Sequence, residues 1–200
     1  MSRYSIVAGV GRNGLERLLN VIEDGADDRV PSAARDCLLA LRDQLEMVKG
    51  QILEMDRRVL AWHRASELSL RLDDIPGVGP LIATALVASV PDPHAFKSGR
   101  DLAAWIGLVP RQNSTGGKER LGHISKAGNC YLRMLLVVGA LSVIRRAKQV
   151  GYTRRPWLTK LLERRSTKIA AIALANKIAR TAWAMMAHGT FYEEPVAQAV

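Results

Sequence analysis

An unbroken heptad of apolar residues, from Leu38 to Trp62, is the sequence feature that most constrains the fold. Its first core positions are Leu38, Leu45, Ile52 and Val59, and its second core positions are Leu41, Val48, Met55 and Trp62. Spacings that alternate between three and four keep one apolar stripe facing a partner helix, which is the pattern of a coiled-coil seam. We therefore predict a long helix over residues 33–71 that dimerises through this seam, giving a homodimer or a higher oligomer.

The residues before the heptad offer another way to cover the seam. Residues 1–32 contain one short predicted helix, from about Gly14 to Glu23, followed by the turn-rich stretch DGADDRVPS. In this alternative, the long helix packs on the short one as an intramolecular hairpin. The heptad pattern is compatible with both arrangements.

The rest of the chain predicts further helices and no sheet, because no stretch alternates convincingly with a period of two. The apolar run from Met134 to Ile144 is shorter than the ~20 residues that span a bilayer, so it predicts a central buried helix and no membrane partner. An alanine-rich helix is predicted from a Ser166 cap to a stop at Gly189. The expected class is all-α, a long coiled-coil helix followed by a compact helical domain. The expected segments are residues 1–32, 33–71, 72–190 and 191–200.

The two cysteines, Cys37 and Cys130, lie far apart and have no repeated spacing. They predict neither a disulfide framework nor a zinc site, so we expect no metal ligands and a reducing cytoplasm. The first residues lack the basic start and apolar run of a secretory signal.

The positive charge is concentrated in the second part of the chain. Residues 1–75 contain 11 Lys and Arg against 13 Asp and Glu, whereas residues 76–200 contain 18 against 6. A positive field of this size favours a polyanionic partner, because lysine and arginine release the counterions condensed on nucleic-acid phosphates. A solvated basic surface is the plainer interpretation.

The stretch IPGVGPLIATAL resembles a helix-hairpin-helix element. Gly77 and Gly79 permit a tight turn, and Pro80 suits the first position of the next helix. Backbone N–H groups at the start of that helix would point at a phosphate. An ordinary glycine turn between packed helices remains the alternative, because Asp73 and Asp74 would repel a phosphate.

A glycine-rich basic loop, RQNSTGGKERLGHISKAGN, extends from Arg111 to Asn129. A hydroxyl that attacks a phosphodiester needs an exposed turn and cations that stabilise the charge of the transition state. Hydroxyls and glycines that could form the turn are Ser114, Thr115, Gly116 and Gly117. Cations that could surround the phosphate are Arg111, Lys118, Arg120, Lys126 and, two helical turns further on, Arg133. By composition alone such a loop more often binds phosphate than cleaves it, and His123 is more often incidental than catalytic.

Three stretches occur in order at a family's spacing: IPGVGPLIATAL, FKSGRDLAAWIGLVPRQNSTGGKERLGHISKAGNCYLRMLLVVGA and ALANKIARTAWAM. Together they resemble the C-terminal half of a bacterial insertion-sequence transposase of the IS one-ten family, over most of residues 15–190. Members of this family join an RNase H-like domain with four metal-binding acidic residues, through a coiled coil, to a domain with a nucleophilic serine. The resemblance implies DNA recombination, with DNA as partner and, for some members, a noncoding guide RNA.

Two departures from the family pattern affect these expectations. The family's serine usually stands immediately before the first glycine of the loop, a position that Thr115 occupies here, with Ser114 one residue earlier. The resemblance therefore implies Thr115 or Ser114 as the attacking hydroxyl, and threonine is more hindered at its branched carbon. The acidic domain is missing, so we expect no cofactor in this chain and assign the implied divalent metal, such as Mg, to that domain.

We therefore expect this chain to be the dimerising, DNA-binding half of a transposase, which alone binds DNA without turnover. Its predicted DNA contacts are Gly77, Gly79, Arg111, Gly116, Gly117, Lys118, Arg120, Lys126 and Arg133. The alternative is a non-enzymatic helix-hairpin-helix protein whose loop only clamps the nucleic-acid backbone.

Overall fold

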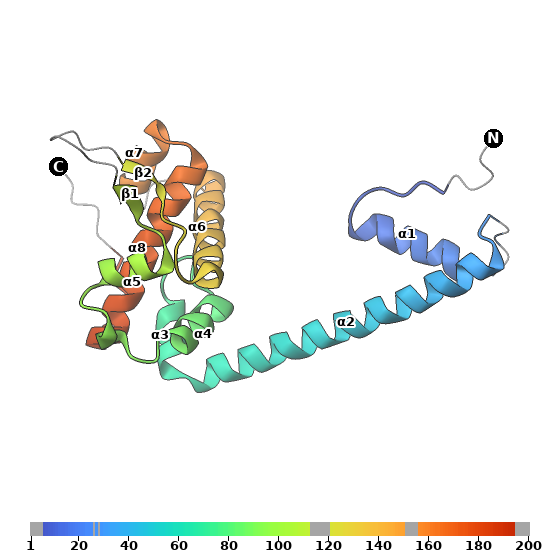
Figure 1. The fold of residues 1–200 in the computed structure, drawn as a ribbon, viewed down its shortest axis with the longest axis horizontal. Helices are drawn as coiled ribbons and strands as arrows, with labels where there is room; N and C mark the ends of the chain where they lie inside the picture. The colour runs from blue at the N-terminus through green and yellow to red at the C-terminus, as the bar shows by residue number, and fades with distance from the viewer. Residues whose placement is uncertain (1–5, 26, 28, 113–120, 151–155, 195–200) are drawn as a thin grey trace. The chain divides into compact units, whose positions relative to one another are not determined.

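The computed structural model describes residues 6–25, 27, 29–112, 121–150 and 156–194 (Figure 1). Contacts within the chain divide it into two units, residues 1–58 and residues 59–200. In the described residues the regular structure is helical except for one two-stranded sheet. The predicted all-α class is confirmed, and the small sheet is an addition that the sequence pattern did not predict.

The first unit contains helix α1, Arg12–Glu23, and most of helix α2, Ser32–Ala65. Polar contacts join α1 to the first turns of α2. The Arg35 Nη1 donates to the Ile22 carbonyl at 2.8 Å, and Arg42 Nη1 lies 3.0 Å from Glu23 Oε1. These contacts hold α1 near the start of α2.

Helix α2 ends at Ala65, whereas the sequence predicted a helix to residue 71. Ser66 has an extended backbone and its side chain accepts a hydrogen bond from the Ser69 amide, so a new helix, α3 (Glu67–Asp73), begins there. The buried His63 stabilises this junction, because its Nδ1 lies 2.8 Å from Ser69 Oγ and its Nε2 lies 3.6 Å from Asp73 Oδ2. A serine cap and a buried histidine therefore set the boundary.

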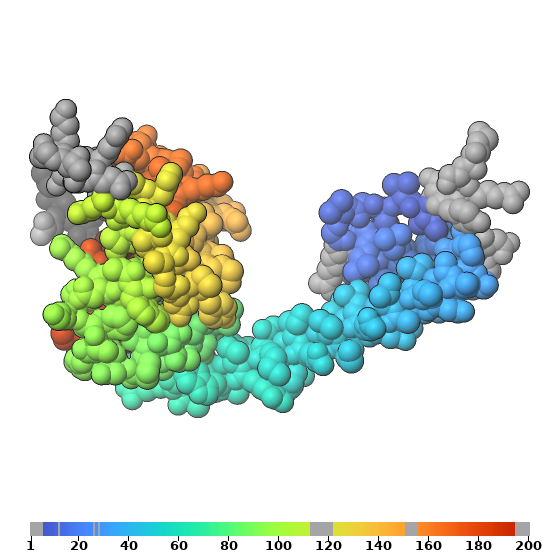
Figure 2. All heavy atoms as spheres, in the orientation of Figure 1, coloured from blue at the N-terminus to red at the C-terminus, as the bar shows by residue number. Residues whose placement is uncertain are grey.

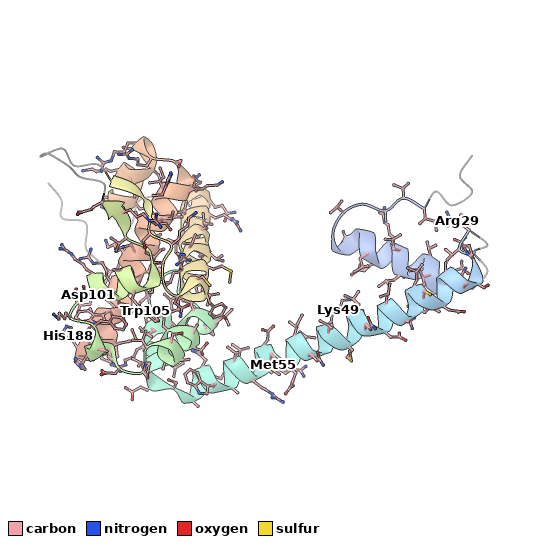
Figure 3. All side chains as sticks on the ribbon, viewed as in Figure 1. Arg29, Lys49, Met55, Asp101, Trp105 and His188 are labelled. Carbon is pink, nitrogen blue, oxygen red and sulfur yellow. The ribbon has the colours of Figure 1, made fainter. Side chains whose placement is uncertain are left out.

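The heptad seam of α2 is exposed in the single chain. Leu41, Ile52 and Met55 expose 60%, 55% and 52% of their surface, and Met55 projects from the middle of α2 (Figure 3). The space-filling view shows the middle of α2 uncovered on the visible face (Figure 2). Burying these apolar side chains against a partner helix would lower the free energy, because it removes apolar surface from water. A partner helix on the seam stays our prediction.

We expect the double substitution Leu45→Asp with Ile52→Asp to convert a dimer into monomers, because both residues occupy core positions of the heptad. Light scattering would show the mass falling by half at equal concentration. The matched control is Met47→Asp with Leu53→Asp, since these apolar residues are 58% and 57% exposed but lie off the seam. A seam variant with an unchanged mass would rule out this dimer.

The second unit contains the last turns of α2 and all later elements. In chain order these are α3 Glu67–Asp73, α4 Pro80–Ser89, the 3₁₀ helix η1 Pro93–Ala95, α5 Gly99–Ile106, β1 Pro110–Gln112, β2 Leu121–Ile124, α6 Cys130–Val150, α7 Pro156–Arg164 and α8 Thr167–His188. None of the described helices is both long and apolar enough to cross a bilayer.

Helix α8 forms the centre of this unit, and its bounds match the predicted Ser166 start and Gly189 stop. It contacts α3, α5, α6, α7 and η1. Its fully buried alanines are Ala170, Ala171, Ala175, Ala179 and Ala182. These short side chains let neighbouring helices approach closely, so α8 takes the central place that we predicted for the apolar run of α6. Helix α6 instead leaves Met134 and Val138 more than half exposed.

Candidate DNA-binding hairpin

The predicted hydroxyl loop connects the two strands of the only sheet in the described residues. Strands β1 and β2 pair antiparallel, with Pro110 opposite Ile124 and Gln112 opposite Leu121. Six predicted site residues lie outside the described part of the chain: Ser114, Thr115, Gly116, Gly117, Lys118 and Arg120. The pairing of the strands brings Gln112 and Leu121, the described residues that flank this segment, side by side.

Two of the predicted cations lie at the root of the hairpin. Arg111 is exposed on β1, and its Nη2 donates to the Ser125 carbonyl across the hairpin at 3.2 Å. Lys126 is exposed immediately after the hairpin and has a φ of 55°, in the left-handed region that a non-glycine residue rarely adopts. The Lys126 amide donates to the Gly107 carbonyl at 3.3 Å. Arg111 therefore lies two residues before the hydroxyl segment, whereas Lys126 lies at the opposite end of the short ladder, beside Gly107.

The hairpin root packs tightly on the end of α5. At Gly128, which has a φ of 81°, an added Cβ would lie 1.7 Å from the Trp105 carbonyl oxygen. Trp105 lies on α5 (Figure 3), and its carbonyl also accepts from the Asn129 amide at 3.4 Å. Asn129 in turn caps α6, because its Oδ1 accepts from the Leu132 amide at 3.0 Å. The segment after β2 is therefore fixed at both ends by helices.

We expect Gly128→Ala to lower the free energy of unfolding by about 2 kcal/mol or more. The new methyl group meets a backbone carbonyl, and the left-handed backbone itself disfavours a side chain. Thermal unfolding followed by circular dichroism measures this change. Gly50→Ala is the matched control, since Gly50 lies in α2 with open space around it and alanine favours helix there. Equal melting temperatures for the Gly128 variant and the wild type would contradict the proposed packing.

Arg133 lies beside the same root and bonds to backbone. Its Nη1 donates to the Ile106 carbonyl at 2.7 Å and to the Ala127 carbonyl at 3.2 Å. The side chain therefore joins the end of α5 to the turn before α6. Its guanidinium already has this structural role, and a phosphate contact by Arg133 stays a prediction.

The glycine turn between α3 and α4 packs against α6. Gly77 has a φ of 92°, and a Cβ there would lie 2.9 Å from the Gly139 carbonyl oxygen. Gly79 precedes Pro80, and no side chain caps the start of α4. Packing against α6 is thus enough to explain why a glycine stands at position 77. The start of α4 has no side-chain cap, so a phosphate contact at Gly79 stays a prediction.

The structure separates this turn from the hairpin root. The turn meets α6 at Gly139, and the root meets α6 at Asn129, ten residues earlier along the helix. At 1.5 Å per residue, the two places are about 15 Å apart along the axis. They are therefore two separate regions and do not form one pocket.

Asn129 and Asn176 are structural residues of the hairpin that we did not predict. Asn176 Nδ2 on α8 donates to the Leu108 carbonyl, two residues before β1, at 3.4 Å. The position of Asn129 before an apolar helix is a cap signal that was available in the sequence, whereas Asn176 had none. His123 is exposed on β2. In the described ranges no three His, Cys, Asp or Glu residues group as metal ligands would.

The sequence is similar to those of known transposases. Residues 69–154 match a family model described as the transposase IS116/IS110/IS902 family. The chain is 44% identical to a putative transposase, y4pF/y4sB, of Sinorhizobium fredii over 98% of this chain and 50% of that protein. It is 41% identical to a probable family 20 transposase of Pseudomonas aeruginosa over 91% of this chain and 54% of the relative. It is also 44% identical to the transposase for insertion sequence element IS1111A of Coxiella burnetii, over 70% of this chain and 38% of that protein.

These relatives put the helical domain in the class of insertion-sequence transposases. Within that class it belongs to the IS116/IS110/IS902 family, whose model covers both the glycine turn and the hairpin. The resemblance to the IS one-ten family is confirmed. The chain spans about half the length of the curated relatives it matches.

Proposed function

We propose that this chain is the half of an insertion-sequence transposase that binds the DNA of the element and supplies the attacking hydroxyl. It acts in the cytoplasm on DNA, as a homodimer or higher oligomer joined through α2. The observation that supports this function best is the antiparallel pairing of β1 with β2. That pairing brings Gln112 and Leu121, which flank residues 113–120, side by side, with Arg111 on β1 and Lys126 at the hairpin root.

The chemistry follows from this placement. The oxygen of Ser114 or Thr115 attacks phosphorus, an oxygen–phosphorus bond forms, and the bond from phosphorus to the leaving sugar oxygen breaks. One phosphodiester replaces another, so the broken strand can later be rejoined without a new energy source. Nearby cations stabilise the extra negative charge on the phosphorus oxygens in the transition state. We assign this role to Arg111 on β1, to Lys126 at the hairpin root, and to Lys118 and Arg120 in the segment between the strands.

The longer members of the family add an acidic domain, and the divalent metal that they use belongs there in our proposal. It would activate the attacking or leaving oxygen as a Lewis acid. This chain contributes the hydroxyl, the cations and the scaffold that orients them. A guide RNA, as the resemblance implies for some members, would be a further partner of the complete protein.

The rival function is a non-enzymatic nucleic-acid clamp, and the uncapped start of α4 supports it. In that case the amides of Gly79 and Leu81 hold one phosphate while the hairpin holds another, because Pro80 has no N–H and the Ile82 and Ala83 amides donate to the Gly79 carbonyl. The two functions share their ligand and differ in product, because only the enzyme forms a covalent bond to DNA.

We expect Lys126→Ala and Arg120→Ala each to weaken duplex DNA binding several-fold. Each should also lower the salt dependence of the binding constant by about one unit, as the loss of one phosphate contact predicts. Fluorescence anisotropy with a labelled duplex at several salt concentrations measures both quantities. Arg57→Ala is the control, since Arg57 is an exposed cation on α2, outside the basic region. An unchanged salt slope in both hairpin variants would remove these cations from the interface.

A further inference from the structure

A long groove lies along one face of α8, separate from the hairpin. Its volume is about 1340 Å³. Side chains of α8 at helical spacing line it, and these are Ala173, Asn176, Lys177, Arg180, Thr181 and Ala184. The start of α5, the start of α7 and the segment after α8 form the rest of its wall. The groove therefore lies within the second unit and is built from four parts of the chain.

The charge of the groove favours an anion. Arg100, Lys177 and Arg180 line it and are exposed, whereas Glu193 is its only lining carboxylate among the described residues. Three cations on a concave surface attract phosphates along a backbone more strongly than they attract a single anionic group.

The aromatic residues of the groove provide surfaces for stacking. Trp157 is 44% exposed although its ring is large and apolar, and Lys177 Nζ lies 4.9 Å from the ring centroid. Phe191 is 68% exposed, with the Arg71 guanidinium carbon 5.8 Å from its centroid. Each ring is paired with a cation and still presents surface to solvent. Cations beside exposed aromatic rings are typical of sites that bind unpaired bases and their phosphates together.

The size of the groove argues for an extended ligand. Sites for small molecules usually have volumes of about 300–1000 Å³, and this groove is larger. A second hollow of about 130 Å³ shares Trp157 and Lys177 with it and reaches Pro76, in the glycine turn between α3 and α4. At the other side, Asn176 lines the groove and bonds the Leu108 carbonyl before β1. The groove thus lies beside a smaller hollow that reaches the glycine turn, and one of its lining residues bonds the chain just before β1.

We propose that this groove binds a single-stranded segment of nucleic acid. Its phosphates contact Arg100, Lys177 and Arg180, and its bases stack on Trp157 and Phe191. This site goes beyond the duplex binding proposed for the hairpin, because a paired duplex keeps its bases stacked on one another and cannot offer their faces to Trp157. Single-stranded DNA and single-stranded RNA share the chemistry that the groove recognises.

The test measures binding of the whole chain to fluorescein-labelled sixteen-nucleotide oligothymidine, oligouridine and a mixed-sequence duplex. We expect Trp157→Ala to weaken binding of at least one single strand about 5- to 150-fold, as the loss of one stacked base predicts, and to leave duplex binding within about twofold. Trp157→Phe should restore most of the affinity, because phenylalanine keeps a ring face. Lys177→Ala should lower the single-strand salt slope by about one unit. The ratio of the two single-strand affinities assigns the ligand to DNA or RNA.

The control variant is Leu53→Ala, since Leu53 is an exposed apolar residue of α2 that lies off the seam and does not line the groove. Circular dichroism establishes whether each variant is folded. If Trp157→Ala unfolds, the single-strand affinity of the double variant Lys177→Ala with Arg180→Ala, at two exposed positions, tests the proposal instead. Unchanged single-strand affinity in the folded groove variants overturns the proposal, as does a wild-type chain that binds the duplex and neither single strand. Binding of no nucleic acid at all would remove the proposed transposase function as well. A loss of duplex and single-strand affinity by the same factor would assign the groove to the duplex and overturn the single-strand site.

Discussion

Replacing both hydroxyls of the loop, Ser114→Ala together with Thr115→Ala, is expected to abolish recombination while DNA affinity stays within about twofold. The reaction should be counted with a marked element, in a full-length transposase that joins this chain to the acidic domain of its family. Loss of the nucleophile typically lowers the rate by at least about 10³-fold. A hydroxyl contributes little to electrostatic affinity, so binding and chemistry should separate.

The two single variants decide which hydroxyl attacks, a choice that the sequence leaves open. Ser125→Ala is the matched control, because Ser125 lies at the hairpin root, outside the hydroxyl segment, where its amide donates to the Val109 carbonyl and its carbonyl accepts from Arg111. We expect this control to recombine normally. Normal recombination by the double alanine variant would instead make the loop a phosphate clamp.

Affinity for duplex DNA should fall steeply with salt and should reside in residues 76–200. If Arg111, Lys118, Arg120 and Lys126 each contact one phosphate, the slope of log K against log salt is about −3.6. That slope corresponds to a loss of roughly 150-fold between 50 and 200 mM salt. Arg133 is left out of this number because its guanidinium donates to the carbonyls of Ile106 and Ala127.

The control for this prediction is a fragment that ends at Asp74. Residues 1–75 have 11 basic against 13 acidic residues, so the fragment should not bind at these concentrations. Anisotropy titrations of both proteins at several salt concentrations give the comparison. A fragment that bound as tightly as the whole chain would move the interface into α1 and α2.

Long helices could be predicted from the sequence because their apolar residues repeat along the chain. The heptad predicted α2, and the Ser166 and Gly189 flanks predicted α8. The hairpin could not be predicted in this way, since its strands have only three and four residues and no clear alternation. Tertiary contacts stabilise the hairpin: Gly128 packs closely on the Trp105 carbonyl, and Arg111 donates a hydrogen bond to the Ser125 carbonyl.

Some residues of the candidate site could likewise be predicted from the sequence, and others could not. Arg111 and Lys126 were predicted from charge, and the structure brings both to the hairpin root. The contacts of Arg133 with backbone carbonyls have no signal in the sequence, because any residue provides a carbonyl. The groove on α8 was not predicted either. Arg100, Trp157 and Lys177 are far apart along the chain, and only the packing of α5 and α7 around α8 brings them together.

The central claim, a covalent bond between this loop and DNA, is tested most directly on a denaturing gel. The full-length transposase is incubated with an end-labelled fragment of its element and then denatured in detergent. Our account predicts a labelled band at the combined mass of protein and DNA that is absent in the variant with Ser114→Ala and Thr115→Ala. A labelled band of equal strength in that variant, or recombination by the wild type through no covalent intermediate, would contradict it.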